Sequence, residues 1–289
     1  MPDEQKYCFL TFDIEEWFQV ENLKDAISAE EWDSFPSSVE NNVQRILDVL
    51  DSFSIKATFF ILGWIAERHP QMVKRIHDSG HEVASHGYNH QLTYTLNDKK
   101  IREDIRSARK KLEDLCGASI RGYRAPSFSI DDRLVDVLQE AGFTYDSSYS
   151  PFKLNARYGN ITRAMEENGS VLRFDNGLLE VPLSMARLGK FTFPIAGGAY
   201  FRLLPLALFR MLVGHFINKN EFYNFYLHPW EFEPEQPRID SIRWDYKIRH
   251  YTGLTKTREH LIKFIRFLQR KQCAFITIAE YLELNDYTK

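Results

Sequence analysis

Residues 7–15 read YCFLTFDIE, an apolar run that ends in two carboxylates. The run predicts a β-strand over residues 7–12, with Asp13 and Glu15 directly beyond it. Because residues i and i+2 of a strand share a face, both carboxylates can point to one place while Ile14 packs inward. Glu16 takes the place of Glu15 if the strand has already bent there, and the sequence leaves this choice open.

Short apolar strands and amphipathic helices alternate along the rest of the chain. The continuous apolar run at 57–62 is typical of a parallel strand buried on both faces. Before this strand, a stripe of apolar residues at helical spacing over 39–50 predicts a helix, with Ser37 or Ser38 as its expected cap. Further strands are expected at 82–85, directly before Arg124, and at 143–145, 178–183, 222–227 and 274–277. Further helices are expected at 70–80, 101–115, 131–142, 204–216 and 258–269, and loops are expected over most of 233–254. The alternation predicts an α/β fold with a mostly parallel sheet, and at 289 residues we expect a β/α barrel.

The composition is that of a globular protein without a charge-driven partner. Lys and Arg number 37 against 40 Asp and Glu, a net charge of −3, so we expect no nucleic-acid partner. The chain has no repeat and no linker-like stretch, which predicts a single domain over 1–289 with a polar insertion around 150–177. No uncharged apolar run approaches the roughly 20 residues that span a bilayer.

The N-terminus and the cysteines indicate a compartment. The first residues, MPDEQKY, lack the basic and apolar regions of a secretory signal. Cys8, Cys116 and Cys273 are widely spaced and odd in number, as expected of reduced thiols. We therefore expect a cytoplasmic protein that works in solution or at the inner face of the inner membrane. The apolar stretch 203–217 is expected to be a core helix, with a peripheral membrane contact or a dimer contact as alternatives, and the oligomeric state stays open.

Polar side chains follow several of the expected strands at the point where each strand ends. Besides the carboxylates at 13–15, these are His86 and His90, Arg124, Asp146 and His228. In an α/β barrel the carboxyl ends of the strands converge on one rim, where active sites are built. The sequence therefore predicts one site assembled from distant segments.

The segment SHGYNH at 85–90 suggests a metal site. Two imidazoles at i and i+4 of a helical turn lie close enough to bind one ion, so we expect His86 and His90 on one face of such a turn. Metal sites of this kind add a carboxylate and keep positions open for water or substrate. The segment around Asp13 and Glu15 can supply that carboxylate.

Together these residues resemble the polysaccharide deacetylase family, the carbohydrate esterases that share the nodulation-type chitooligosaccharide deacetylase domain. Segments similar to its five motifs occur in order at 11–15, 85–90, 124–127, 145–148 and 227–228. More narrowly, DIEEWF at 13–18 and HPWE at 228–231 look like a bacterial branch tied to exopolysaccharide and lipopolysaccharide assembly.

The resemblance implies a distorted β/α barrel that removes N-acetyl groups from amino sugars with a divalent metal, zinc first and nickel, cobalt or manganese as alternatives. The resemblance implies that Asp13 is the general base, that Arg124 orients it and that His228 is the general acid. It also implies three metal ligands, namely Glu15, His86 and His90. Two departures stand out. The second carboxylate of the first motif is a glutamate two places on rather than an adjacent aspartate, and Ser127 stands after the proline of the third motif, where an aromatic residue is usual.

The chemistry of these residue types agrees with those roles. A divalent cation polarises an amide carbonyl and lowers the pKa of a bound water toward about 7. Asp13 can take the water proton, and the Ser127 backbone N–H can help to stabilise the oxyanion. His228 can protonate the departing amine, provided that a carboxylate such as Asp146 or Glu231 keeps it charged.

An amino sugar of a bacterial surface polysaccharide, O-antigen or exopolysaccharide, or its lipid-linked or nucleotide-linked precursor, is the expected substrate. Sugar sites combine aromatic platforms with a few polar groups, which makes candidates of Trp17, Ser127, Phe128, Tyr149, Trp230 and Glu231, although core packing is the alternative for each aromatic residue. The segment GGAYFR at 197–202 can border the pocket. Hydrolysis of an N-formyl sugar or a cyclic amide, and a non-catalytic sugar-binding module, remain the alternatives.

Overall fold

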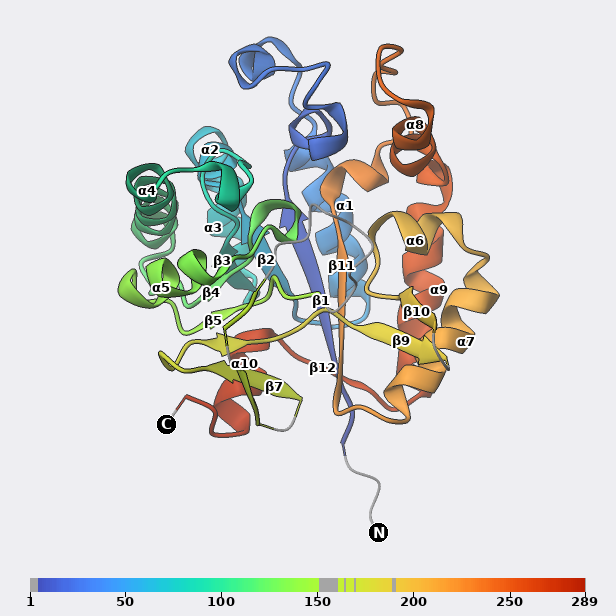
Figure 1. The fold of residues 1–289 in the computed structure, drawn as a ribbon. Coiled ribbons are helices and arrows are strands. Elements are labelled where there is room, and N and C mark those ends of the chain that lie inside the picture. The colour runs from blue at the N-terminus through green and yellow to red at the C-terminus, as the bar shows by residue number, and fades with distance from the viewer. Residues whose placement is uncertain (1–4, 151–160, 164, 169, 189–190, 289) are drawn as a thin grey trace.

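A curved parallel sheet lies at the centre of the computed structural model, which describes residues 5–150, 161–163, 165–168, 170–188 and 191–288 (Figure 1). Seven parallel strands of the described residues follow the order β11, β1, β2, β3, β4, β5 and β8. Their bounds are β1 Tyr7–Ile14, β2 Thr58–Ile61, β3 Glu82–Ser85, β4 Gly122–Tyr123, β5 Tyr145–Asp146, β8 Leu179–Glu180 and β11 Phe222–Leu227. The antiparallel strands β7 (Val171–Phe174) and β6 (Met165–Asn168) extend the sheet beyond β8, and β12 (Ala274–Phe275) pairs with β1. A separate hairpin joins β9 (Met185–Leu188) to β10 (Phe191–Pro194).

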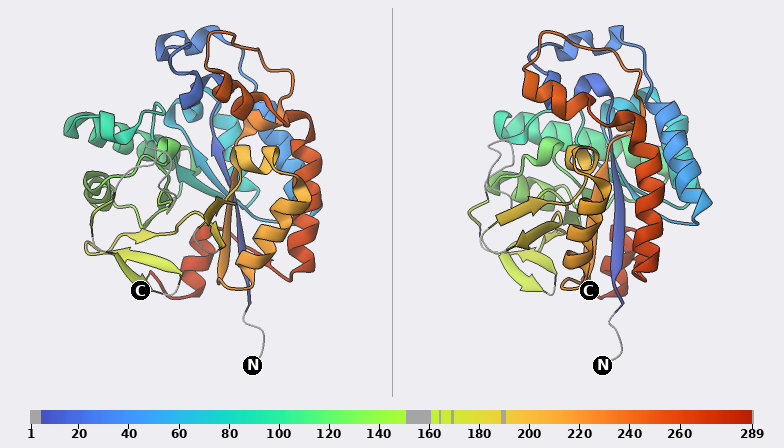
Figure 2. Two further views of the ribbon diagram at one scale, coloured as in Figure 1. Left: turned by 45° about the vertical axis from the view of Figure 1, so that its right-hand side comes forward. Right: turned by 90° about the vertical axis from the view of Figure 1, so that its right-hand side faces the viewer.

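Helices surround the sheet on its outer side, as the views in Figure 2 show. They are α1 Val39–Ser52, α2 Gly63–Arg68, α3 Pro70–Asp78, α4 Asp98–Cys116, α5 Asp132–Glu140, α6 Gly198–Leu203, α7 Leu206–Ile217, α8 Trp244–Tyr251, α9 Thr257–Arg270 and α10 Ile278–Leu284. The alternation of strands and helices confirms the predicted α/β class with mostly parallel strands.

The barrel is distorted because side chains, rather than a backbone ladder of the described residues, join β11 to the segment just beyond β8, the first and last of the parallel strands. Asn224 of β11 donates its side-chain amide to the carbonyls of Val181 and Pro182, just beyond β8, at 3.3 Å each. The Ser184 hydroxyl in turn accepts the Asn224 backbone N–H at 2.8 Å. Pro182 has no N–H to donate, so it cannot continue a regular ladder here.

The inward-facing residues of β1 change from apolar to polar along the strand. Phe9 packs against Tyr281 of α10, with ring centroids 5.1 Å apart, and this helix covers the amino-terminal end of the barrel. Thr11 comes next and donates its hydroxyl to the Phe225 carbonyl at 2.9 Å. Asp13 follows at the carboxyl end, so the polar groups collect at the rim opposite α10.

Several parts of the fold differ from the sequence-based expectation, among them α2, α6 and the β9–β10 pair, which were not expected. The loop-rich region 233–254 contains α8, where Trp244 is 74% exposed and helical periodicity is therefore weak. Helix α10 was not expected, although the Thr277 hydroxyl and the Glu280 carboxylate form a capping box that signals its start. Of the polar insertion, 151–160, 164 and 169 lie outside the described residues, and β6 and β7 pair as antiparallel strands in the described part.

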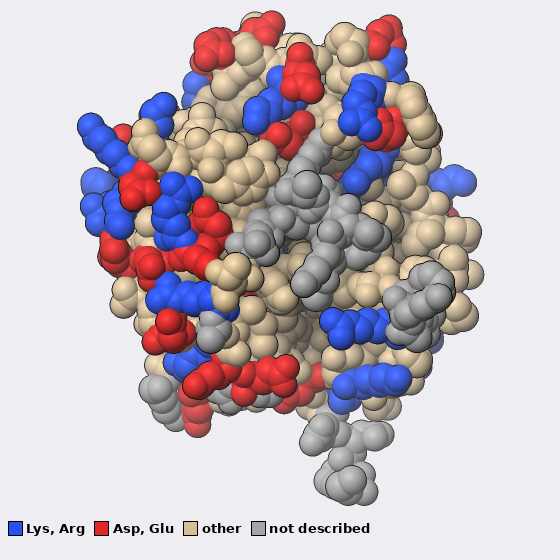
Figure 3. All heavy atoms as spheres, in the orientation of Figure 1, with Lys and Arg blue, Asp and Glu red and all other residues tan. Residues whose placement is uncertain are grey.

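The surface carries charges of both signs close together. On the face seen in Figure 3, Lys and Arg side chains alternate with Asp and Glu, in keeping with the net charge of −3. Within the ranges that the structure describes, none of the helices is both long enough and apolar enough to cross a membrane.

Two acidic residues face each other inside the barrel. Asp146 of β5 and Glu180 of β8 are direct neighbours across the two strands, and both are fully buried. Burial and then the charge of Asp146 raise the pKa of Glu180 well above its usual value. The folded protein therefore favours a protonated Glu180.

Replacement of Glu180 by glutamine should reduce the loss of stability at high pH. Above the usual glutamate pKa of about 4.3 the unfolded chain releases a proton that folded wild-type protein retains, so wild-type stability falls as the pH rises through the raised pKa. Glutamine does not titrate, and it keeps an acceptor for the Tyr149 N–H, which Glu180 binds at 2.9 Å. Thermal unfolding between about pH 5 and about pH 9 should show a shallower decline for Glu180→Gln.

Glu103→Gln is the matched control because Glu103 is exposed on α4. Its melting temperature should follow that of the wild type across the pH range. A decline in Glu180→Gln as steep as in the wild type would contradict the assignment.

Candidate active site

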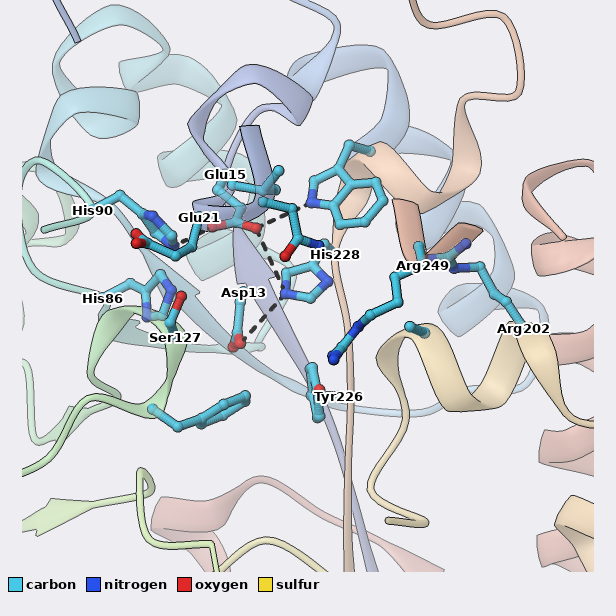
Figure 4. A pocket seen from close by; sticks show the side chains of 15 residues that line it. Asp13, Glu15, Glu21, His86, His90, Ser127, Arg202, Tyr226, His228 and Arg249 are labelled. Atoms are coloured by element: carbon cyan, nitrogen blue, oxygen red, sulfur yellow. Dashed lines mark hydrogen bonds and ion pairs between the residues drawn. The ribbon is translucent and has the colours of Figure 1, made fainter. Parts of the chain in front are cut away.

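A cavity of about 690 Å³, counting space open to the solvent, lies at the carboxyl ends of the strands (Figure 4). Its lining combines carboxylates, imidazoles, aromatic rings and two arginines: Asp13, Glu15, Val20, Glu21, Asn22, His86, His90, Ser127, Phe128, Ala199, Arg202, Tyr226, His228, Trp230 and Arg249. The structure thus brings eight of the sequence-predicted site residues to one cavity, namely Asp13, Glu15, His86, His90, Ser127, Phe128, His228 and Trp230.

Glu15, His86 and His90 form a set that fits a metal ion. All three are buried, and one ligand atom of each lies within 4.8 Å of those of the other two. Glu15 Oε2 and His90 Nε2 are 2.5 Å apart, and the buried His90 Nδ1 has no hydrogen-bond partner among the described residues. Trp230 orients the carboxylate by donating its indole N–H to Glu15 Oε1 at 3.0 Å. A buried carboxylate and two buried imidazoles whose ligand atoms converge on one place are what a cation site requires.

His86 is held in a form that suits a ligand. Its Nδ1 lies 2.8 Å from the Arg124 backbone carbonyl, which accepts a hydrogen bond and so leaves the Nε2 lone pair for the site. Burial is the largest influence on its pKa and lowers it to about 4, which keeps the imidazole neutral. Only neutral imidazole can coordinate a metal ion.

The segment from His86 to His90 is a loop, so the predicted helical turn is wrong. Gly87 has φ 75° and His90 has φ 49°, both in the left-handed region that a right-handed helix does not use. Asp104 of α4 holds the loop open by accepting the Tyr88 N–H at 2.8 Å. The two rings nevertheless meet, with centroids 5.5 Å apart.

The structure assigns different positions to the two neighbouring glutamates. Glu16 Oε1 accepts the backbone N–H groups of Ser38 and Val39 at 2.9 and 3.0 Å, at the first turn of α1. Glu16, rather than a serine side chain, therefore caps this helix and turns away from the cavity. Glu15 remains as the carboxylate that faces His90.

Asp13 is oriented by a fully buried arginine. Arg124 Nη1 donates to Asp13 Oδ1 at 2.8 Å and to the Thr11 hydroxyl at 2.7 Å, and its Nε donates to the Ser147 carbonyl at 2.9 Å. Arg124 does not line the cavity, so it acts on the site through Asp13.

His228 lies between the carboxylates of the cavity and a buried glutamate. Its Nε2 is 3.6 Å from Glu15 Oε1 and 3.9 Å from Asp13 Oδ2, and its Nδ1 is 2.7 Å from Glu231 Oε1. Burial lowers the pKa of His228, but the charge of Glu15, the hydrogen bond to Glu231 and the charges of Glu231 and Asp13 together raise it to about 9. Arg202 forms a buried ion pair with the other oxygen of Glu231.

These contacts separate the two carboxylates proposed as partners of His228. Glu231 is that partner, and it lies fully buried behind the imidazole, so its predicted role in substrate binding is wrong. Asp146 is not at the cavity, because it accepts the Ser148 hydroxyl at 2.7 Å and faces Glu180. A direct catalytic role for Asp146 does not fit this position.

The predicted aromatic residues divide between the cavity and the core. Trp17 is 1% exposed and packs edge-on against Phe18 and Phe35, so the structure places it in the core and away from substrate. Tyr149 is partly buried and is not among the described residues that line the cavity. Trp230 does line it and stacks on His228, with ring centroids 5.2 Å apart.

Several cavity residues were not singled out from the sequence. Glu21 follows the first motif by six positions, and Tyr226 lies within an aromatic strand, so neither stands out by its spacing. Arg249 belongs to α8, in the region expected to be loops. Ala199 and Arg202 belong to the segment 197–202 that was expected at the pocket border.

Comparison with protein families covers almost the whole chain in two parts. Residues 1–145 match the polysaccharide deacetylase family, and residues 147–283 match a domain of unknown function (DUF3473). The chain belongs to the polysaccharide deacetylase family. The first part contains Asp13, Glu15, both loop histidines and Arg124, whereas His228 and Glu231 come from the second.

Individual relatives agree with this membership. A peptidoglycan deacetylase-like protein of Gibberella zeae is 37% identical over 110 residues, which cover 37% of this chain and 32% of that protein. A peptidoglycan-N-acetylglucosamine deacetylase of Bacillus cereus is 31% identical over 99 residues, which cover 34% of this chain and 46% of that protein. The chain thus matches less than half the length of either relative.

The fold has close counterparts among solved structures. A crystal structure from Mycobacterium smegmatis, assigned as a polysaccharide deacetylase, aligns with a TM-score of 0.65 at 21% identity. The alignment covers 98% of this chain and 91% of that one. The likeness shows that both parts of the chain together follow the barrel fold of these proteins.

Glu15→Gln should weaken metal binding, whereas Glu16→Gln should lower the stability of the fold. Loss of the Glu15 carboxylate should weaken zinc binding by more than the about 10–100-fold that is typical when a group supporting a ligand is removed. Glu16→Gln should bind zinc as the wild type does but lose about 1 kcal/mol of unfolding free energy, because the α1 cap is weakened. Calorimetric zinc titration and urea unfolding measure the two effects. Loss of zinc binding in Glu16→Gln alone would contradict the ligand assignment.

Proposed function

We propose that this protein is a metal-dependent hydrolase that removes the N-acetyl group from an amino sugar of a polysaccharide. One observation carries the proposal: a metal-binding set, a positioned carboxylate and a paired imidazole meet in one cavity. The similarity to a peptidoglycan-N-acetylglucosamine deacetylase of Bacillus cereus supports the same class of substrate. Because the site needs Asp13 and His228 together, we also propose that residues 1–289 work as a single catalytic domain.

Glu15, His86 and His90 would hold the ion, which we propose to be zinc. Two imidazoles and one carboxylate are a common set for catalytic zinc and also suit nickel, cobalt or manganese. A divalent cation in this position supplies Lewis-acid polarisation of the amide carbonyl and makes a water molecule more acidic.

Asp13 is positioned to act as the general base. Arg124 occupies Oδ1 of the carboxylate, so Oδ2, on the side of His228, is available to a water molecule in the cavity. Asp13 takes one proton from that water as the water oxygen bonds to the acetyl carbon. The backbone around Ser127 lies on the same wall, and its φ of 52°, followed by 59° at Phe128, is a rare pair for residues other than glycine. We assign the Ser127 N–H as a donor to the developing oxyanion.

His228 is positioned to act as the general acid. Because Glu231 accepts the Nδ1 proton, the Nε2 proton of the charged ring faces the cavity. His228 transfers this proton to the sugar nitrogen as the carbon–nitrogen bond breaks, and the products are acetate and a free amino sugar. Arg202 supports the acid by holding Glu231 in place.

We further propose that the substrate belongs to a bacterial surface polysaccharide, such as an O-antigen or exopolysaccharide, or to its lipid-linked or nucleotide-linked precursor. The support is the resemblance of the segments 13–18 and 228–231 to that branch of the family. Phe128 and Trp230 supply apolar surface on the cavity wall against which a sugar ring can lie.

Removal of the metal should abolish acetate release from N-acetylglucosamine oligosaccharides. Dialysis against a chelator should remove both zinc and activity, and stoichiometric zinc should restore them, because the amide is poorly reactive without a Lewis acid. Elemental analysis and an enzymatic acetate assay measure the two quantities. A zinc-loaded protein that releases formate from N-formyl sugars or opens cyclic amides, and spares N-acetyl sugars, would overturn the proposal.

His228→Ala should lower turnover by about 10²–10⁴-fold, since general acid catalysis contributes that much. Its zinc content should be unchanged, because His228 is not one of the three residues that would hold the ion. His215→Ala is the matched control, since His215 is exposed on α7 and distant in sequence from every motif. Loss of zinc in His228→Ala would exclude the assignment of His228 as the acid.

A further inference from the structure

The part of the chain that matches a domain of unknown function contributes two arginines to the cavity, Arg202 and Arg249. Arg202 is already neutralised. It forms the buried ion pair with Glu231 and donates to the backbone carbonyls of Arg249 and His250 at 2.7 and 3.1 Å. Its guanidinium therefore holds α8 against the site and is not available to a ligand.

The guanidinium of Arg249, unlike that of Arg202, is not in an ion pair with any described residue. Its backbone is held by Arg202, and its side chain extends into the cavity toward the space between His228 and Tyr226 (Figure 4). Arg249 takes part in none of the ion pairs formed among the described residues. Its guanidinium carbon lies 5.8 Å from the centre of the Tyr200 ring.

Two other cations, one directly before α8 and one within it, contrast with Arg249. Arg243 pairs with Asp245 at 2.9 Å, and Lys247 pairs with Asp240 at 3.4 Å, both on the outer surface. The carboxylates of the cavity are also occupied, since Asp13 is paired with Arg124, Glu15 with His90, and Glu21 with Lys24. Arg249 is thus a cavity cation without an ion-pair partner among the described residues, and its charge is open to a ligand.

We propose that Arg249 forms a subsite for an anionic group of the substrate, next to the N-acetyl sugar that is hydrolysed. This inference rests on the proposed function and adds that the substrate is acidic. A guanidinium binds carboxylate and phosphate equally well through paired hydrogen bonds. The anion is therefore either the carboxylate of a neighbouring uronic acid or the diphosphate of a carrier.

The test compares three probes on the wild type and on Arg249→Gln. A neutral N-acetylglucosamine oligosaccharide, an oligosaccharide that alternates N-acetylglucosamine with glucuronic acid, and UDP-N-acetylglucosamine represent no anion, a carboxylate and a diphosphate. Dissociation constants are measured by calorimetry on metal-free protein, and kcat and KM on the zinc-loaded protein. We expect the wild type to prefer one acidic probe, and Arg249→Gln to reduce that preference by about ten-fold or more, through KM rather than kcat.

Two further variants make the test decisive. Arg249→Lys should restore part of the preference, because it keeps the charge but not the planar fork. Arg243→Gln, directly before the same helix but paired with Asp245 on the outer surface, should match the wild type. A wild type without preference for either acidic probe, or the same preference in Arg249→Gln, would overturn the subsite. Acidic probes that bind through Arg249 but are never deacetylated would overturn the proposed function instead and leave the subsite standing.

Discussion

The buried ion pair between Arg124 and Asp13 is the interaction on which the arrangement of the site depends. Burial of a guanidinium is costly unless its N–H groups are paired, and Arg124 meets this condition through Asp13, Thr11 and Ser147 and by lying 4.1 Å from the centre of the Phe60 ring. The same residue orients His86 through its backbone carbonyl. One buried arginine thus positions both a carboxylate and an imidazole, so the two cannot move independently.

A second constraint is the register between β1 and β11. Phe12 is the direct neighbour of Leu227 across this parallel pair, so the residues that follow, Asp13 and His228, leave their strands side by side. The proposed base and acid therefore come from opposite ends of the chain but share one edge. Since β11 lies in the part that matches a domain of unknown function, that part contributes residues such as His228 and Trp230 to the cavity.

The region around α8 determines where positive charge lies on the cavity wall. Arg202 links Glu231, behind His228, to the carbonyls at the end of α8, and this connection fixes where Arg249 enters. The positions of the proposed acid, His228, and of the charge at the cavity wall are thus coupled through one buried arginine. A change in this region would alter both, whereas the metal set on the other side is supported by β1, by Arg124 and by the loop at 85–90.

The sequence by itself determined the alternation of strands and helices, the polar residues at strand ends and the resemblance to the family, because these depend on local periodicity and short spacing. Only the tertiary structure decided between neighbours of equal chemistry. Glu16 caps α1 and Glu15 faces His90, Glu231 rather than Asp146 pairs with His228, and Trp17 joins the core. Glu16 caps a helix that begins at Val39, and Trp17 packs against Phe35, so both outcomes depend on partners far away in the sequence that leave no local pattern. Glu231 lies only three residues from His228, but local spacing does not show that Asp146 faces Glu180 instead. For the same reason Arg249 could not be recognised, since its significance lies in the absence of an acidic partner among the described residues.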